Sequence, residues 1–228
     1  MMTKNLGIVI YDFVQPMDVF GPWEVFSVWK NILNVPINLY LVSENEQQIH
    51  CDDKITLNAH CTFDNAPDFD YFIVPGGKGR LEQSKNAKLL DFIKKQANHC
   101  EFLLSVCTGM FLLYHAGLLK DKPVTTYWRA VPEIQALKDI KFCGERIVKS
   151  GKIWTAGGIS SGIDLALELI ASIAGKETAG KVQLLFEYFP ERLSYCNLET
   201  KNQLPDYAPN VSSKATDLPQ YIKDYINS

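Results

Sequence analysis

The sequence lacks an excess of charge of either sign, and it lacks paired cysteines. It has 23 lysines and arginines against 26 aspartates and glutamates, a formal net charge of −3, whereas nucleic-acid-binding proteins usually have a basic surplus. Its six cysteines are scattered over 228 residues without a CxxC pair, which argues against a disulfide framework and a zinc ribbon. We therefore expect reduced thiols and no nucleic-acid partner.

The sequence also predicts neither a secretory leader nor a membrane span. The first residues run into a strand-like segment without a charged region, an apolar stretch and a cleavage site, which predicts a cytoplasmic protein. Residues 102–119 contain no charged side chain, and their length alone would suit a membrane helix. Because they include polar residues and no second such run exists, a buried strand followed by a buried helix is the better interpretation.

The composition that is present is typical of a soluble globular chain. Hydrophobic residues make up 46% and charged residues 21%, and the length suits one large domain or two small ones. Strand and helix patterns alternate, which favours an α/β sandwich with a mostly parallel sheet. The pattern dissolves after residue 189, so we expect one domain over 1–189 and a tail over 190–228, packed on the domain or extending from it.

The expected elements follow from hydrophobic periodicity and turn residues. One helix is expected to open at Gly21-Pro22, one to start with a capping box at Ser161–Asp164, and a hairpin to turn at Ser150-Gly151. Further strands are expected at 6–11, 38–42, 71–74, 102–106 and 124–127, with one or two edge strands of a small hairpin at 55–63. The helix that starts at Ser161 is expected to cover 161–174, and further helices are expected at 87–97, 108–119, 130–137, 176–188 and 221–226.

The strongest local signal is the stretch Ser105–Gly109, in which an apolar strand gives way to a helix within about two residues. Cys107 lies at this corner, the position of a nucleophile elbow. Free helical N–H groups and the helix dipole would lower the pKa of its thiol. The alternative is a buried packing cysteine, the usual role of a free cysteine.

A nucleophilic thiol needs an acid or base beside it. His115 lies eight residues along the same helix, roughly 12 Å away along the axis, and cannot pair with Cys107. Asp18 and Glu24 follow the first strand, whose carboxyl end would lie beside the elbow if that strand is central. Asp18 could equally be the N-cap of the helix that follows it.

Two glycine-rich turns could complete the site. Gly76 and Gly77 end a strand at the same sheet edge, where a free N–H could hold an oxyanion; the alternative is an ordinary tight turn. Gly157-Gly158 closes another strand and could face the same cleft. The pairs His50-Cys51 and His60-Cys61 fit no zinc pattern, because neighbouring side chains on a strand point to opposite faces. We therefore expect no metal.

These stretches together resemble the ThiJ/PfpI superfamily, whose fold is like the class I glutamine amidotransferase domain, and within it the isonitrile hydratase branch. They occur in the order of that branch and cover about residues 6–189. The matching stretches are Met17–Pro22, Val74–Gly77, Ser105–Gly109, Thr125–Trp128, Ala156–Ile159 and Gly162–Asp164.

The resemblance implies a flavodoxin-like three-layer sandwich, a homodimer, a small-molecule substrate, and no metal or organic cofactor. It implies that Cys107 is the elbow nucleophile, Asp18 its acidic partner and Thr108 a further site residue. Backbone N–H groups of Gly77 and Thr108 match an oxyanion pocket. The remaining residues expected to bind substrate are Gly76, Tyr127, Trp128 and Gly158.

The sequence departs from the family pattern at two places. Protease-like members have His directly after the cysteine, where this chain has Thr108, which argues against a Cys-His-acid protease. Hydratase-like sequences commonly read Thr-Thr-His-Trp, where this chain has Tyr127, a group that donates a hydrogen bond but is a poor base at neutral pH.

The leading hypothesis is a cofactor-free hydratase that converts a small isonitrile into an N-formamide. The alternatives are a hydrolase or glyoxalase-like enzyme acting on small carbonyl compounds, and a redox sensor whose Cys107 oxidises to a sulfinate. A transcription regulator is disfavoured, because the 39 residues after Phe189 are too few for the helix-turn-helix pair of such proteins.

Overall fold

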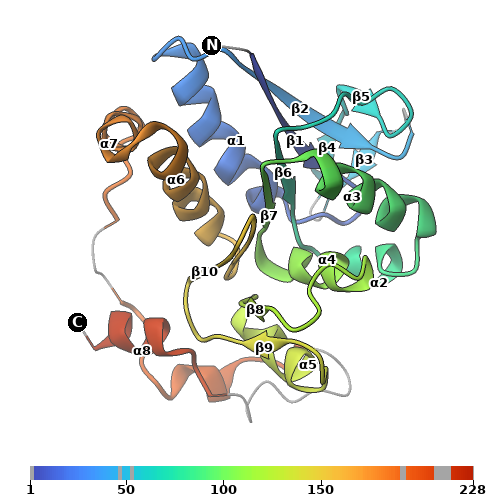
Figure 1. The fold of residues 1–228 in the computed structure, drawn as a ribbon. Helices are drawn as coiled ribbons and strands as arrows, with labels where there is room; N and C mark the ends of the chain where they lie inside the picture. The colour runs from blue at the N-terminus through green and yellow to red at the C-terminus, as the bar shows by residue number, and fades with distance from the viewer. Residues whose placement is uncertain (1–2, 46–47, 52–53, 191–193, 208–216, 228) are drawn as a thin grey trace.

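A seven-stranded sheet forms the centre of the described part of the molecule. The computed structural model describes residues 3–45, 48–51, 54–190, 194–207 and 217–227; the first two residues and parts of the expected tail therefore lie outside it. The strand order is β10-β11-β7-β6-β1-β2-β5. Every neighbouring pair is parallel except β10 and β11, which confirms the predicted mostly parallel α/β fold (Figure 1).

The strands and helices have the following bounds. The sheet contains β1 (Lys4–Val9), β2 (Ile37–Ser43), β5 (Cys61–Thr62), β6 (Tyr71–Val74), β7 (Phe102–Ser105), β10 (Ile147–Ser150) and β11 (Ile153–Ala156). Two small pairs join β3 (Ile49–His50) to β4 (Thr56–Leu57) and β8 (Pro123–Val124) to β9 (Lys141–Phe142). The helices are α1 (Pro16–Asn31), α2 (Arg80–Gln83), α3 (Ala87–His99), α4 (Met110–His115), α5 (Val131–Gln135), α6 (Ser161–Ala174), α7 (Lys176–Leu185) and α8 (Gln220–Ile226).

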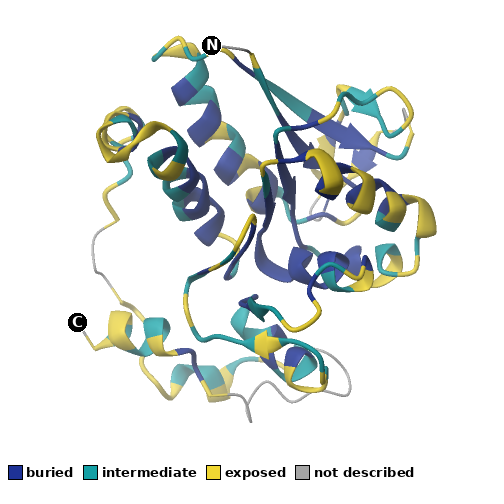
Figure 2. Ribbon diagram, in the orientation of Figure 1, coloured by how far each residue is buried: buried dark blue, intermediate teal, exposed yellow. Residues whose placement is uncertain are grey.

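Helices cover both faces of the sheet and make three layers. Helices α1, α6 and α7 contact one another on one side, and α2, α3 and α4 pack on the other (Figure 1). The central strands are therefore buried on both faces (Figure 2). All four residues of β6 are buried, as expected for the continuous apolar run of a parallel strand covered on both sides.

The register brings the carboxyl ends of four strands to one edge. Val74 at the end of β6 is opposite Ser105 at the end of β7, and Thr155 of β11 also pairs with Ser105. Ile8 of β1 pairs with Ile73 of β6. The loops that follow β1, β6, β7 and β11 therefore share this edge, where open α/β sheets bind their ligands.

The first helix begins earlier than predicted. It starts at Pro16, whose missing N–H is harmless at a first-turn position, and Pro22 lies inside it. The ring of Pro22 lies over Gly162 of α6, where an added Cβ would be 3.1 Å from Pro22 Cδ. Asp18 is therefore a first-turn residue of α1 and not its N-cap, a position that Gln15 occupies.

Three other local predictions need correction. The helix expected over 108–119 is a 3-10 turn at Cys107–Gly109 followed by the short α4, and Gly117, with φ 75°, lies just beyond its end. The strand-like segment 124–127 pairs only at Pro123–Val124. The capping box at Ser161 does not form, because the Ser161 hydroxyl donates to the Gly157 carbonyl and Asp164 pairs with Arg146.

The uncharged run 102–119 is divided between β7, the 3-10 turn and α4. Most of its residues are buried inside the protein, as Leu104 and Leu112 illustrate, whereas His115 and Gly117 are exposed. Among the helices of the described residues, none is both long enough and apolar enough to span a bilayer.

Candidate active site

Cys107 lies on the sharp turn between β7 and α4. Its φ of 57° is in the left-handed region, which a residue with a side chain adopts only where the surroundings hold it there. The Cys107 N–H donates to the Gly157 carbonyl at 2.8 Å, and its carbonyl accepts from the Thr126 hydroxyl at 2.8 Å. Strand β11 and the loop after β8 thus fix the strained backbone on both sides.

Two glycines allow the loop after β6 to press against this turn. A Cβ on Gly76 would lie 2.6 Å from Thr108 N, and a Cβ on Gly109 would lie 2.1 Å from the Val74 carbonyl oxygen. Real side chains do not approach backbone atoms so closely, so both positions require glycine. The Gly76 turn is therefore built for close backbone approach to the elbow, beyond the needs of an ordinary tight turn.

Asp18 reaches the elbow from the first turn of α1. Its side chain is fully buried, and its Oδ2 accepts the Gly76 N–H at 2.9 Å. Burial raises the pKa of this carboxyl to about 7. The hydrogen bonds from the Gly76 N–H and the Cys107 thiol act in the opposite direction and lower the pKa. Asp18 Oδ1 has no regular hydrogen-bond partner among the described residues, which leaves one acceptor in the site for a proton.

The thiol of Cys107 is surrounded by donors, yet its pKa is raised. The N–H groups of Thr108 and Ile159 and the Thr108 hydroxyl all lower the pKa of this thiol. Burial, with the side chain 6% exposed, and the charge of Asp18 together outweigh them. The N–H groups therefore act in the expected direction, but the expected net lowering of the pKa is wrong, because desolvation and the charge of Asp18 disfavour the thiolate more strongly than these donors favour it.

Thr108 connects the glycine turn to the thiol. Its hydroxyl accepts the Gly77 N–H at 3.2 Å and hydrogen-bonds the Cys107 sulfur. The Gly77 N–H, expected to serve an oxyanion, is thus directed at Thr108 in this structure. The arrangement forms a relay from the Gly77 N–H through the Thr108 hydroxyl to the sulfur.

The other predicted residues are unequally placed. The Tyr127 ring packs on Gly158, where an added Cβ would be 2.6 Å from the ring, and its pKa is raised by burial and in part by Cys107. Trp128 lies next to Tyr127, with the two ring centroids 6.2 Å apart, and its own ring faces the Arg129 guanidinium at 5.9 Å. Glu24 is exposed and does not belong to the site.

Sequence reasoning missed Ile159 and Tyr11. Ile159 contributes its N–H to the sulfur from a backbone with φ 38°; the glycines before it drew attention, but an isoleucine gives no signal of such a role. Tyr11 is buried and donates to the Pro75 carbonyl at 2.7 Å, which anchors the turn before Gly76. Its pattern is that of any buried strand residue.

No metal centre is formed by the described residues, in which no three His, Cys, Asp or Glu side chains are grouped to hold an ion. His60 instead accepts the Leu41 N–H and stacks on Trp23. The His-Cys pairs thus have structural surroundings.

Known proteins resemble this chain over most of its length. It is 34% identical to isonitrile hydratase of Pseudomonas putida over 189 residues, which cover 83% of this chain and 80% of that protein. It is 27% identical to the HTH-type transcriptional regulator GbdR of Pseudomonas aeruginosa over 150 residues, 65% of this chain and 41% of the regulator.

The fold is also found in solved structures. A ThiJ/PfpI family protein from Pseudomonas syringae superimposes with a TM-score of 0.78 at 22% identity, covering 98% of this chain and 84% of that one. Residues 4–172 match the DJ-1/PfpI family, a span that includes the sheet, the elbow and the loops that hold Cys107. The chain therefore belongs to the DJ-1/PfpI family.

Proposed function

We propose that the protein is a cofactor-independent hydratase that adds water to a small isonitrile and releases an N-formamide. The observation that supports this proposal is the arrangement of Cys107 with Asp18 and Thr108 at the elbow. The 34% identity to an isonitrile hydratase supports the choice of substrate class. In this proposal Cys107 is the nucleophile, Asp18 the proton carrier and Thr108 the residue that orients the sulfur.

The first step forms a covalent intermediate. Asp18, whose pKa is raised to about 7, takes the proton of the Cys107 thiol as the sulfur attacks the terminal carbon of the isonitrile. The same proton is then delivered to that carbon, which gives a thioimidate, R–N=CH–S–Cys107. The thiol hydrogen and the sulfur have both been added to one carbon, and no oxidant or reductant is consumed.

The second step releases the product. Water adds across the C=N bond, with its proton passing through Asp18 to the nitrogen and its oxygen bound to carbon. The carbon–sulfur bond then breaks, the formamide R–NH–CHO leaves, and the thiol regains a proton. The N–H groups of Thr108 and Ile159 stabilise the sulfur anion as it departs.

The direct test is hydration of an alkyl isonitrile by the purified protein. We expect formation of N-cyclohexylformamide from cyclohexyl isonitrile, and a loss of at least about a thousandfold in kcat/KM for Cys107→Ala. Cys196→Ser, which changes an exposed thiol, is the matched control and retains activity. Turnover by the wild type no faster than by Cys107→Ala would overturn the proposal.

The structure offers less support to the redox sensor. Oxidation of a cysteine to the sulfinate begins from an accessible thiolate. Cys107 is 6% exposed, and its pKa is raised by burial, so its thiolate fraction at neutral pH is small. Small carbonyl compounds remain the comparison substrates, and methylglyoxal assayed beside the isonitrile separates the two enzyme activities.

The same proposal includes a homodimer in the cytoplasm, with no nucleic acid, membrane, metal or organic cofactor involved. An apolar surface beside the site supports the dimer: Phe13 is 51% exposed, and Met17 and Phe20 are also exposed. Light scattering on the eluting protein tests this part, with a dimer mass expected for the wild type and a monomer mass for Met17→Glu.

A further inference from the structure

The tail of the chain approaches the candidate site from outside the matched family region. The sheet runs with its amino ends toward the N-terminus at the top of Figure 1, and the orange-to-red tail passes below, beside β8 and β9. The described tail residues 194–207 and 217–227 include two half-buried tyrosines, Tyr207 and Tyr221. Both belong to the part of the chain after residue 172, where the family match ends.

Tyr207 packs on the aromatic group next to the elbow. Its ring meets that of Tyr127 edge to face, with centroids 5.6 Å apart. The Arg129 guanidinium lies 5.5 Å from the centre of the Tyr207 ring and donates to the Pro205 carbonyl in the same tail segment. Tyr207 is thus held against the loop that follows β8.

Tyr221 approaches the backbone that holds the nucleophile, at Gly157. Its hydroxyl lies 2.9 Å from the point that a Cβ on Gly157 would occupy. The carbonyl of Gly157 accepts the N–H of Cys107 at 2.8 Å, so the phenol of α8 sits one residue from the backbone of the nucleophile. Burial raises the pKa of Tyr221 and of Tyr207, and the charge of Cys107 contributes to both, in keeping with two neutral phenols near the sulfur.

The cationic groups beside these tyrosines are already engaged. Arg80 is buried and binds Glu133 through two contacts of 2.6 and 2.8 Å, and it lies over the Phe111 ring. Arg129 is held between Trp128, Tyr207 and the Pro205 carbonyl. Arg146, which lies near Tyr221, is bound to Asp164 at 2.8 Å. An anionic substrate entering here would therefore lose its hydration and face the charge of Asp18, while these three arginines of the described residues keep their protein partners.

We propose that Tyr207 and Tyr221 are specificity-determining residues, through which the tail forms an aromatic wall over Cys107 that admits small, uncharged molecules. The inference rests on the proposed function in one respect, the use of Cys107 as the reacting group. It extends the site beyond the strands and loops of the family domain and makes the tail part of the substrate pocket.

Site-resolved alkylation tests the wall without any assumed substrate. Cys107 and the exposed Cys196 are quantified by mass spectrometry in one digest of the full chain, and the Cys107/Cys196 ratio corrects for reagent chemistry. The probes are iodoacetamide, the equally small but anionic iodoacetate, and the bulky N-phenylmaleimide. In the wild type we expect the ratio to be at least tenfold higher for iodoacetamide than for each of the other two probes.

Removal of the wall should admit the bulky probe. We expect Tyr207→Ala and Tyr221→Ala each to raise the N-phenylmaleimide ratio at least threefold. Phe189→Ala is the matched control, since Phe189 is an aromatic residue that is 59% exposed and lies next to neither thiol; it should leave the ratio unchanged. Gly157→Ala is a second route, because its methyl group displaces the Tyr221 hydroxyl without any change to the tail sequence, and it should also raise the ratio.

The outcomes separate this inference from the proposed function. In the wild type, a Cys107/Cys196 ratio for iodoacetamide less than tenfold above the ratio for either of the other two probes would overturn the proposed aromatic wall. A rise below threefold in both tail variants and in Gly157→Ala would also overturn it, as would an equal rise in Phe189→Ala, even if isonitrile turnover is found. The expected ratios without isonitrile turnover would support the wall and contradict the hydratase.

Discussion

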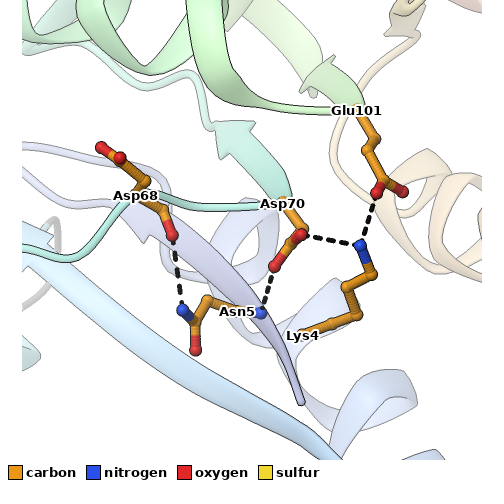
Figure 3. A network of polar contacts seen from close by, with 5 residues as sticks. All are labelled: Lys4, Asn5, Asp68, Asp70 and Glu101. Atoms are coloured by element: carbon orange, nitrogen blue, oxygen red, sulfur yellow. Dashed lines mark hydrogen bonds and ion pairs between the residues drawn. The ribbon is translucent and has the colours of Figure 1, made fainter. Parts of the chain in front are cut away.

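The two ends of the central sheet treat their carboxylates in opposite ways. At the amino ends of β1, β6 and β7, Lys4 lies 2.8 Å from Asp70 and also binds Glu101, while Asn5 donates its backbone N–H to Asp70 at 2.8 Å (Figure 3). These groups are partly exposed to water. At the carboxyl end Asp18 is fully buried with one N–H donor, and no ion pair of the described residues includes it.

The difference lies in what each end does with its charge. The two carboxylates raise the pKa of Lys4, so Lys4 keeps its positive charge between them over the usual pH range. Burial brings the pKa of Asp18 to about 7, so that end gains and loses a proton near neutrality. A satisfied charge stabilises the fold, whereas an unsatisfied one is available for proton transfer.

Replacement of the buried carboxylate of Asp18 should have the largest effect of all changes that distinguish the two ends of the sheet. For Asp18→Asn we expect a fall in kcat/KM for the isonitrile of about a hundredfold to ten-thousandfold, the usual contribution of a general acid or base. The thiolate absorbance of Cys107 near 240 nm should also develop at a lower pH, because a negative charge beside the thiol is removed.

Glu24→Gln is the control for this change, since it removes an exposed carboxylate from the same helix. It should alter neither the rate nor the thiolate titration. An active Asp18→Asn enzyme with kcat/KM within tenfold of wild type would remove Asp18 from the mechanism.

The close backbone approach at the carboxyl end should be the next most sensitive feature. In Gly109→Ala the new methyl group would lie 2.1 Å from the Val74 carbonyl oxygen, so the strand and the elbow must separate. We expect a loss of about 4 kcal/mol in the free energy of unfolding, measured with denaturant. Gly180→Ala, in α7 with no neighbour within 4 Å, should instead stabilise the protein slightly; equal losses in both variants would contradict the expected clash.

The pH dependence of stability sharpens the comparison further. The Asp18 carboxyl has a folded-state pKa of about 7 against an ordinary value of 3.8, so the folded state binds the proton more tightly. Its contribution to stability is therefore present below pH 4 and is lost as the pH rises toward 7. We expect the wild type to lose roughly 3 kcal/mol relative to Asp18→Asn between pH 4 and 8. Parallel stability profiles for the two proteins would show that the pKa of Asp18 is not raised.

The smallest effect is expected at the amino end. Lys4→Met removes the cation between Asp70 and Glu101, and we expect a loss of about 0.5–1 kcal/mol that shrinks at high salt, because these groups are partly hydrated. Lys94→Met, which breaks an exposed pair with Asp91, should cost less than Lys4→Met. If Lys4→Met lowered the free energy of unfolding as much as Gly109→Ala, the two ends of the sheet would be equally important for stability.

The sequence predicts those parts of this molecule that depend on local pattern. The strand Tyr71–Val74 and the helix Ser161–Ala174 are found with the predicted ends, because apolar runs and turn residues mark them. The beginning of α1 was missed, since the fit of Pro22 over Gly162 is a tertiary contact. Cys107 was marked by its position at the predicted strand-to-helix corner, whereas Asp18, far from it in the chain, was left between a site residue and an N-cap until the resemblance to the family favoured the site.

Other features of the site depend on the folded surroundings and have no local signature. The direction of the pKa shift of Cys107 was wrong, because burial and the charge of Asp18 arise from the assembled site. Tyr207 and Tyr221 were missed, since their contacts require the tail to return to the elbow, and nothing in a polar, irregular segment indicates such a path.

The left-handed backbone of Cys107 has a consequence for how this chain can evolve. A residue with a side chain at φ 57° costs about 1 kcal/mol or more relative to glycine, and a buried carboxylate next to it adds to that cost. At neutral pH, Asp18→Asn would relieve the cost of the buried charge and keep an oxygen for the Gly76 N–H, whereas Cys107→Gly would relieve the backbone strain but remove a buried side chain. Both features lower stability, so stability alone would not retain them, and the proposed reaction would be the reason that they persist together while the sheet does not depend on either.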